Sequence, residues 1–226
     1  MPVIAISSQL GSEGANIAGR VAQRLGLITL DHQNLLQRLA RHGFSLADIQ
    51  PSCENEQASR ENNWKADKIG KIISSEILFL AQKNSMLIHS PFAPYLLADI
   101  SHIPRIQVHT PLVQRARNFA AANSCSESEA LQKITANDAQ SSWILETAFG
   151  VENPNRPDNF DLVADTGWLS PQDWAEQILD LAQDPDFLPT ANSKTKLRAL
   201  ATRNAARVFD LHCGTDPCQT SATLGR

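Results

Sequence analysis

Short apolar runs alternate with longer stripes of apolar residues at helical spacing along this chain. Val3, Ile4 and Ile6 belong to an apolar, β-branched run that predicts a first strand. A helical stripe follows this run, and the same order recurs toward the C-terminus. We expect strands at 2–7, 27–30, 85–89, 105–109 and 160–165, and helices at 15–26, 33–42, 64–83, from 111, from about 127 and at 171–182.

Strands that alternate with helices predict an α/β fold with a parallel sheet covered on both faces. The polar stretch 43–63 lacks periodicity, so we expect a loop or an irregular insert there. Asp184, Pro185 and Asp186 end the alternating pattern. We therefore expect a main domain over 1–183 and an extension over 184–226.

The extension begins with a basic amphipathic segment at 194–208, which carries five Lys and Arg residues and no acidic residue. Two interpretations are open for this segment. It is a solvated helix docked on the main domain, or it contacts a partner such as a protein, a membrane surface or a nucleic acid. We expect residues 210–226 to form a disordered tail.

Composition narrows the functional classes. The chain has 226 residues and a net charge of -4, so its overall charge does not suggest a nucleic-acid binder. It has neither an apolar run near the ~20 residues that cross a bilayer nor a secretion signal, so we expect a cytoplasmic protein. The four cysteines are scattered, and the spacing of His212, Cys213 and Cys218 is not typical of zinc, so no metal site is predicted.

The turn after the first strand is the strongest candidate for chemistry. A strand, a glycine-containing turn and a helix N-terminus together make a cradle for phosphate, because backbone N–H groups converge there with the helix dipole. The residues predicted to hold an anion are Ser8, Gly11, Ser12, Gly14, Ala15 and Asn16, with the backbone amides from Gly11 to Asn16 as donors. The alternative is an ordinary strand–turn–helix unit without a ligand.

A complete P-loop has the pattern G-x-x-x-x-G-K-[ST], and this turn departs from it. With Gly11 in the middle of the loop, Ser8 stands at the first glycine, Glu13 at the second and Gly14 at the lysine. The first lysine of the chain is Lys65. Two unit charges ~4 Å apart interact by about 4 kcal/mol at an effective dielectric near 20, so a carboxylate at Glu13 would repel a triphosphate unless it turned away.

At this point the chain resembles the cytidylate kinase-like family of P-loop nucleoside monophosphate kinases. The family's turn has the form S-R-x-x-G-S-G-G-R-E-I-A, and the residues here are S-S-Q-L-G-S-E-G-A-N-I-A over 7–18. The likeness continues with L-G at 25–26, Asp31, T-P-L-V-Q-R at 110–115 and F-D-L-V-A-D-T at 160–166. It covers about residues 2–182.

The resemblance implies a P-loop NTPase-type three-layer sandwich with a five-stranded parallel sheet and a helical lid, followed here by the C-terminal helical extension. It implies an ATP site at the first turn, with Mg²⁺, and transfer of the γ-phosphoryl group to a nucleoside monophosphate or a similar small acceptor. Arg115 would close over the nucleotide, and Asp138 would act from the lid. The resemblance also implies a monophosphate site near Asp31. His89, which ends a predicted strand at the same edge of the sheet, is a further candidate to approach the phosphate of the acceptor or to act in proton transfer.

Each of these residues also has a structural alternative. Asp31 could cap the next helix, His89 could be a partly buried, hydrogen-bonded side chain, and Arg115 could lie at the surface. The family's D-x-x-R in the lid becomes Asp138 to Ser141 here, without the arginine. Two functions therefore remain open: a kinase with weakened activity, or a catalytically impaired nucleotide-binding or regulatory module.

Overall fold

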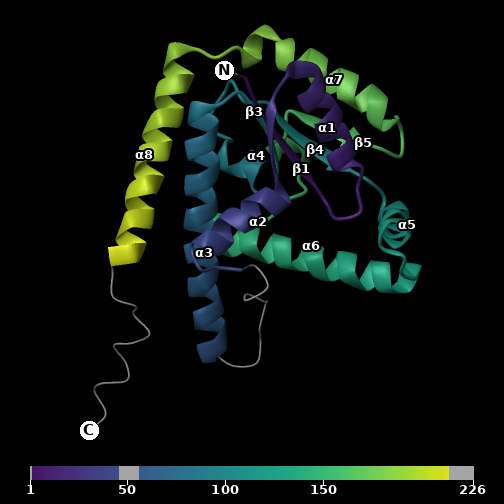
Figure 1. Ribbon diagram of the computed structural model, residues 1–226, viewed down its shortest axis with the longest axis horizontal. Helices are drawn as coiled ribbons and strands as arrows, with labels where there is room; N and C mark the ends of the chain where they lie inside the picture. Colours follow the sequence, from purple (N-terminus) through teal and green to yellow (C-terminus); the bar gives the residue numbers. More distant parts are fainter. Residues whose placement is uncertain (1, 46–55, 214–226) are drawn as a thin grey trace.

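The computed structural model describes residues 2–45 and 56–213, and it describes their side chains except those of 56–60 and 210–213. Figure 1 gives the arrangement of the elements. In chain order they are β1 Val3–Ser8, α1 Gly14–Leu25, β2 Ile28–Asp31, α2 His32–Arg41, α3 Glu56–Lys83, β3 Met86–His89, α4 Ala93–Leu96, β4 Arg105–His109, α5 Leu112–Asn123, α6 Glu127–Phe149, η2 Pro157–Asn159, β5 Leu162–Asp165, α7 Pro171–Gln183, η3 Pro185–Phe187 and α8 Ala191–Cys213.

The five strands form one parallel sheet in the order β2-β3-β1-β4-β5. The predicted α/β fold with a five-stranded parallel sheet is therefore confirmed. Strand β1 lies in the centre, where Ile6 pairs with His89 of β3 on one side and with Ile106 of β4 on the other. All strands run the same way, so their carboxyl ends meet at one edge of the sheet, where ligands bind in open α/β folds.

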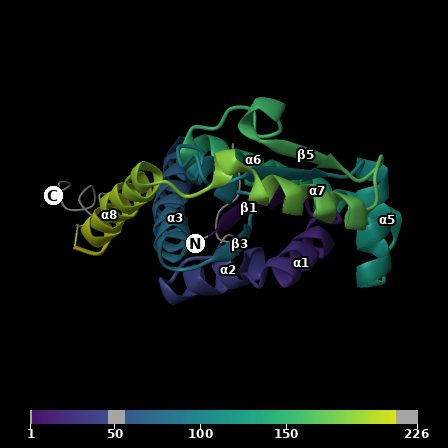
Figure 2. The ribbon, with the colours of Figure 1, turned by 90° about the horizontal axis from the view of Figure 1, so that it is seen from above.

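Alternate side chains of the strands enter two different cores. Ile4 and Ile6 of β1 pack in a core with α1 and α7. Val3 and Ala5, on the opposite face, pack in a core with α2, α3, α4, α6 and the start of α8. Figure 2 shows the sheet between these two helical layers. Burial on both faces explains the apolar runs of the two inner strands β1 and β3, at Val3–Ile6 and Met86–Ile88.

Several helix ends confirm the local signals in the sequence. Ser126 and Glu129 form a reciprocal capping box at the start of α6, and the Ser170 side chain caps α7. Gly26 ends α1 in the left-handed conformation, with φ of 62°. These signals are local, because each depends on a few neighbouring residues, and so the sequence alone identifies them.

Two expectations need correction. Residues 56–63 belong to α3, which begins at Glu56 and not at 64. This first part of α3 is polar and therefore carries no apolar stripe for a periodicity argument. The helix predicted at 194–208 is longer and runs over Ala191–Cys213, so residues 210–213 are helical and not part of a tail. The rest of the predicted loop, at 46–55, and the predicted tail at 214–226 lie outside the described residues.

Helix α8 packs lengthwise along α3 (Figure 1). Its contact side chains include Leu197 and Ala201, which are buried in the same core as α3. Its basic side chains over 194–207 are exposed. The extension is therefore docked on the main domain through its apolar face. Among the described residues, no helix has the length and apolar character needed to span a membrane.

We expect Leu197→Ala to lower the free energy of unfolding by about 2–4 kcal/mol, because it leaves a cavity between α8 and the core. Arg203→Ala is the matched control on the exposed face of the same helix, with an expected change within about 0.5 kcal/mol. Urea denaturation of the full chain measures both. Equal stabilities of the two variants would contradict the docking of α8.

Candidate functional site

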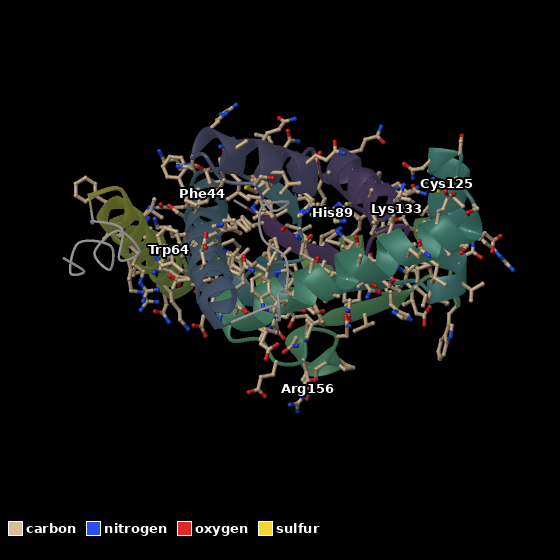
Figure 3. The ribbon with its side chains drawn as sticks, turned by 90° about the horizontal axis from the view of Figure 1, so that it is seen from below. Phe44, Trp64, His89, Cys125, Lys133 and Arg156 are labelled. Carbon is tan, nitrogen blue, oxygen red and sulfur yellow. The ribbon has the colours of Figure 1, made fainter. Side chains whose placement is uncertain are left out.

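A pocket of about 380 Å³ lies at the carboxyl edge of the sheet, beside the β1–α1 turn. The turn forms one wall, and α6 with the loop after it forms the opposite wall. Figure 3 shows His89 in the middle of the molecule, between α6 and the pair of helices α1 and α2. Six predicted site residues line this single pocket: Ser8, Gly11, Ser12, Ala15, His89 and Asp138.

The turn keeps its shape through close backbone packing. Gly11 has φ of +79°, and a Cβ at this position would lie 2.5 Å from the carbonyl oxygen of Arg115. Ser12 donates its N–H to the carbonyl of Gln9, and its Oγ accepts the N–H of Gly14 at 3.2 Å. Only glycine fits at position 11, because both the dihedral angle and the approach of α5 exclude a side chain.

Arg115 fixes the turn to two helices. Its guanidinium donates from Nε to the carbonyl of Leu10 at 2.9 Å and forms a two-pronged pair with the carboxylate of Asp138, at 2.8 Å for each bond. The Arg115 side chain is only 3% exposed. The two predicted catalytic residues therefore contact each other, and in this conformation Arg115 holds the turn from behind and does not line the pocket.

A second arginine, Arg117, follows Arg115 two positions later on α5. Arg117 lies on another side of α5, is exposed and pairs weakly with Glu127 at 3.9 Å. Only Arg115 faces the turn, as the separation of two helical positions indicates.

Glu13 is turned away from the pocket. Its carboxylate accepts hydrogen bonds from Asn16 at 3.1 Å and from Asn118 of α5 at 3.5 Å. Asn118 also donates to the carbonyl of Gly11 at 3.1 Å, and Arg20 donates to the side chain of Asn16 at 2.9 Å. The carboxylate does not line the pocket, so its expected repulsion of an anion is reduced by this orientation.

Ser8 and His89 form a hydrogen-bonded pair at the bottom of the pocket. Ser8 Oγ lies 2.7 Å from Nε2 of His89, across the ends of β1 and β3. Gly14 packs directly against them, because a Cβ there would lie 2.3 Å from Ser8 Cβ and 3.1 Å from His89 Nε2. A side chain at position 14, where a P-loop has its lysine, would therefore clash with Ser8 and lie very close to the imidazole of His89.

His89 is neutral over the physiological pH range. Burial, with a smaller contribution from the neighbouring His32, lowers its pKa from 6.5 to about 4, and Asp31 opposes the shift. Burial also lowers the pKa of His32, whose Nδ1 atom is buried without a hydrogen-bond partner among the described residues. The imidazole of His89 therefore offers one N–H donor and one lone pair.

Asp31 caps α2, which is one of the two alternatives that the sequence left open. Its Oδ1 accepts the backbone N–H of Asn34 at 2.7 Å. Asp31, Gly14, Asn16 and Arg115 do not line the pocket. Their predicted contacts with a ligand stay predictions.

The loop after α6 contributes residues that the sequence did not reveal. Pro154 and Asn155 line the pocket, and they are held by Tyr95, which donates its hydroxyl to the carbonyl of Pro154, and by Gln107, which donates to Asn155 Oδ1 at 2.9 Å. No local pattern could have found these contacts, because the partners lie 59 and 48 positions apart in the sequence. Only the polar and proline-rich character of 149–159 marked the segment as a loop.

Among the described residues that line the pocket, the charged group is the carboxylate of Asp138, which Arg115 neutralises, and there is no lysine or arginine. The walls otherwise offer hydroxyl, amide and imidazole groups. Such a surface can bind an anion through neutral donors and backbone N–H groups, with less electrostatic stabilisation than a cationic side chain would supply.

We expect Asp138→Asn to lower the free energy of unfolding by about 3 kcal/mol, because it leaves the buried Arg115 cation without a counter-charge. Asp158→Asn is the matched control, since the Asp158–Arg156 pair is exposed and its loss should cost less than about 1 kcal/mol. Chemical denaturation at neutral pH measures both. If Asp138→Asn lost no more free energy of unfolding than Asp158→Asn, the Arg115–Asp138 pair would not stabilise the turn.

The folded protein should lose stability in acid through His89. Its pKa rises from about 4 in the folded state to 6.5 on unfolding, so the unfolded chain binds the extra proton first. Stability from this group is complete above the unfolded pKa and falls by about 2 kcal/mol between about pH 7 and pH 5. Denaturation of wild type and of His89→Gln over this pH range isolates the contribution of His89 to stability, because the other histidines contribute to both proteins. Parallel curves for the two proteins would refute the assignment.

Comparison with known proteins gives the family. The model of the cytidylate kinase-like family matches residues 3–167 of the chain. A curated cytidylate kinase from Ignicoccus hospitalis is 26% identical over 180 residues, which cover 79% of this chain and 97% of the relative.

Among solved structures, an uncharacterized protein from Eubacterium ventriosum superposes with a TM-score of 0.61 and 14% identity, over 80% of this chain and 97% of the other. This second likeness concerns the fold alone. The family match spans the sheet, the β1–α1 turn, Arg115 and Asp138. The chain thus belongs to the cytidylate kinase-like family, which supports a nucleotide kinase-like function.

Proposed function

We propose that this protein binds ATP with Mg²⁺ at the β1–α1 turn and transfers the γ-phosphoryl group, with weakened activity, to a nucleoside monophosphate or a similar small acceptor. The observation that supports it most directly is the tightly packed turn beside a pocket of about 380 Å³, at the edge where parallel sheets bind ligands. Family membership and the cytidylate kinase relative favour a nucleotide as the ligand.

The residues of the turn suit a phosphate. Gly11 permits the close, left-handed bend, and the first-turn N–H groups of α1 at Ala15 and Asn16 have no intrahelical acceptor. These amides and the dipole of the 12-residue helix α1 would hold the phosphates. Both carboxylate oxygens of Asp138 accept bonds from Arg115, so Mg²⁺ would enter with the nucleotide, without an assigned side-chain ligand.

The weakened activity follows from the distribution of cations. Phosphoryl transfer depends on positive groups that neutralise the charge spread over the transferred oxygens. Arg115, the arginine attached to the turn, already donates three hydrogen bonds to Leu10 and Asp138. To reach a phosphate it would have to release at least part of this contact.

A nucleotide-binding module without turnover is the second candidate. It is favoured by the packing at Gly14, where Ser8 and His89 leave no room for a lysine side chain. In this function the nucleotide would set the position of α5 and α6 through the turn. The exposed basic side chains of α8 would then be a surface for a protein partner, as the sequence suggests, in a cytoplasmic setting.

Calorimetry with ATP and Mg²⁺ on the full chain, beside a coupled assay with each nucleoside monophosphate, tests the proposal. We expect ATP binding that survives in the absence of acceptor and a slow turnover with one monophosphate. Binding without any turnover would favour the module, and absence of ATP binding would reject both functions.

A designed variant tests the electrostatic explanation of weak activity. Ser8→Gly combined with Gly14→Lys removes the nearer of the two obstructing side chains and adds a cation at the lysine position. We expect ATP to bind about tenfold more tightly, since a charge-assisted bond of about 1.4 kcal/mol corresponds to that factor. Ser8→Gly alone is the control and should not tighten binding. An unchanged affinity of the double variant for ATP would show that the missing positive charge at position 14 does not limit ATP binding.

A further inference from the structure

We propose that Ser8 is a nucleophile that accepts the γ-phosphoryl group of the bound nucleotide, with His89 as its general base, so that the protein phosphorylates itself at Ser8. This inference rests on the proposed binding of ATP at the β1–α1 turn. It goes beyond that function because the phosphoryl acceptor is a side chain of the protein and not a small molecule.

The first support is the geometry of the pair. Ser8 ends β1 and His89 ends β3, two neighbouring parallel strands that carry both side chains to the same pocket. The 2.7 Å between Ser8 Oγ and His89 Nε2 is within the reach that a nucleophile and its base require. In the tautomer that carries its proton on Nδ1, the imidazole accepts the hydrogen bond of the serine hydroxyl.

The second support is the position of the hydroxyl against the start of α1. A Cβ placed on Gly14 would lie 2.3 Å from Ser8 Oγ, so the hydroxyl lies next to the first residue of this 12-residue helix. The positive end of the helix and the free N–H groups of its first turn stabilise negative charge on a phosphoryl group there. The nucleophile thus lies in the same cradle that the proposed function assigns to the phosphates.

The third support is the protonation of His89. The groups around it are His32 of α2, Asp31 at the end of β2, and Ser8, with Tyr95 and Asp138 on the walls of the same pocket. Burial and His32 together outweigh Asp31 and lower the pKa of His89 to about 4. The imidazole is therefore a free base at neutral pH and well into mild acid.

The reaction balances without a further reagent. Ser8 Oγ forms a bond to the γ-phosphorus while the bond from this phosphorus to the β,γ-bridging oxygen breaks, and ADP leaves. The hydroxyl proton passes to Nε2 of His89 and then to water. The product is a phosphoserine at the N-terminus of α1, where its charge is stabilised, and it fills the cradle that the next nucleotide would enter.

The test is incubation of the full chain with ATP and Mg²⁺, followed by intact mass measurement and peptide mapping. We expect one phosphate group per chain, located at Ser8, and none in Ser8→Ala. Ser7→Ala, which removes the neighbouring hydroxyl, is the matched control and should keep the modification. His89→Gln should slow it by about 100-fold or more, the usual contribution of a general base.

The pH profile adds a readout that a merely structural hydrogen bond would not produce. The rate of modification should stay constant from about pH 8 to pH 5 and fall below that range, because His89 protonates only near a pKa of about 4. A rate that halves near an ordinary histidine pKa would reject His89 as the base. Melting curves of His89→Gln establish that the variant is folded.

A fluorophosphonate probe examines the nucleophile without a nucleotide. Attack by Ser8 Oγ on its phosphorus expels fluoride, and we expect labelling of wild type at Ser8 that His89→Gln reduces. Calorimetry with ATP separates the two proposals: ATP binding with Ser8 unmodified overturns this inference alone, while absence of ATP binding overturns it together with the proposed function. Failure of the probe to label Ser8 also overturns it.

Discussion

The buried guanidinium of Arg115 is the interaction on which the shape of the site depends. One side chain joins the carbonyl of Leu10 in the turn to the carboxylate of Asp138 in α6, while its own helix supplies the backbone that presses on Gly11. An arginine is 3% exposed here only because its charge is paired and most of its fork is hydrogen-bonded. The Arg115 side chain therefore links the turn, α5 and α6 in this conformation.

The contacts of Arg115 leave its guanidinium outside the pocket. The family resemblance assigns Arg115 to the nucleotide, but in this conformation its guanidinium is hydrogen-bonded to Leu10 and Asp138. The described residues that line the pocket offer neutral donors and no lysine or arginine. Binding of an anion then depends on backbone amides and on a helix dipole, both of which are fixed by the fold. In the proposed function, catalysis would depend on positive charge that Mg²⁺ supplies or that Arg115 supplies after its release from Asp138.

The Ser8–His89 pair has the opposite character. It costs little to maintain, because two neutral groups satisfy each other at the ends of adjacent strands. Yet it places a hydroxyl and a free imidazole lone pair at the positive end of a helix, which is the arrangement that nucleophilic catalysis uses. Burial is the cause of both properties, since it keeps the imidazole neutral and holds the serine in place.

The sequence by itself determined the sheet, the order of the elements and the position of the turn. The run Val3–Ile6 is apolar because both faces of a parallel sheet are buried, and the caps at Ser126 and Gly26 depend on near neighbours. It missed the polar start of α3 and the helix α4, which packs into a core and has no period of its own over four residues.

Only the tertiary structure decided the roles of the site residues. Sequence reasoning named Ser8, His89, Arg115 and Asp138, but it could not tell that they form two pairs, Ser8 with His89 and Arg115 with Asp138. Hydrogen bonds between residues 81 and 23 positions apart follow from how strands and helices are placed in space. A sequence lists which groups are present, whereas burial and distance determine which of them are neutral, which are paired and which face the pocket.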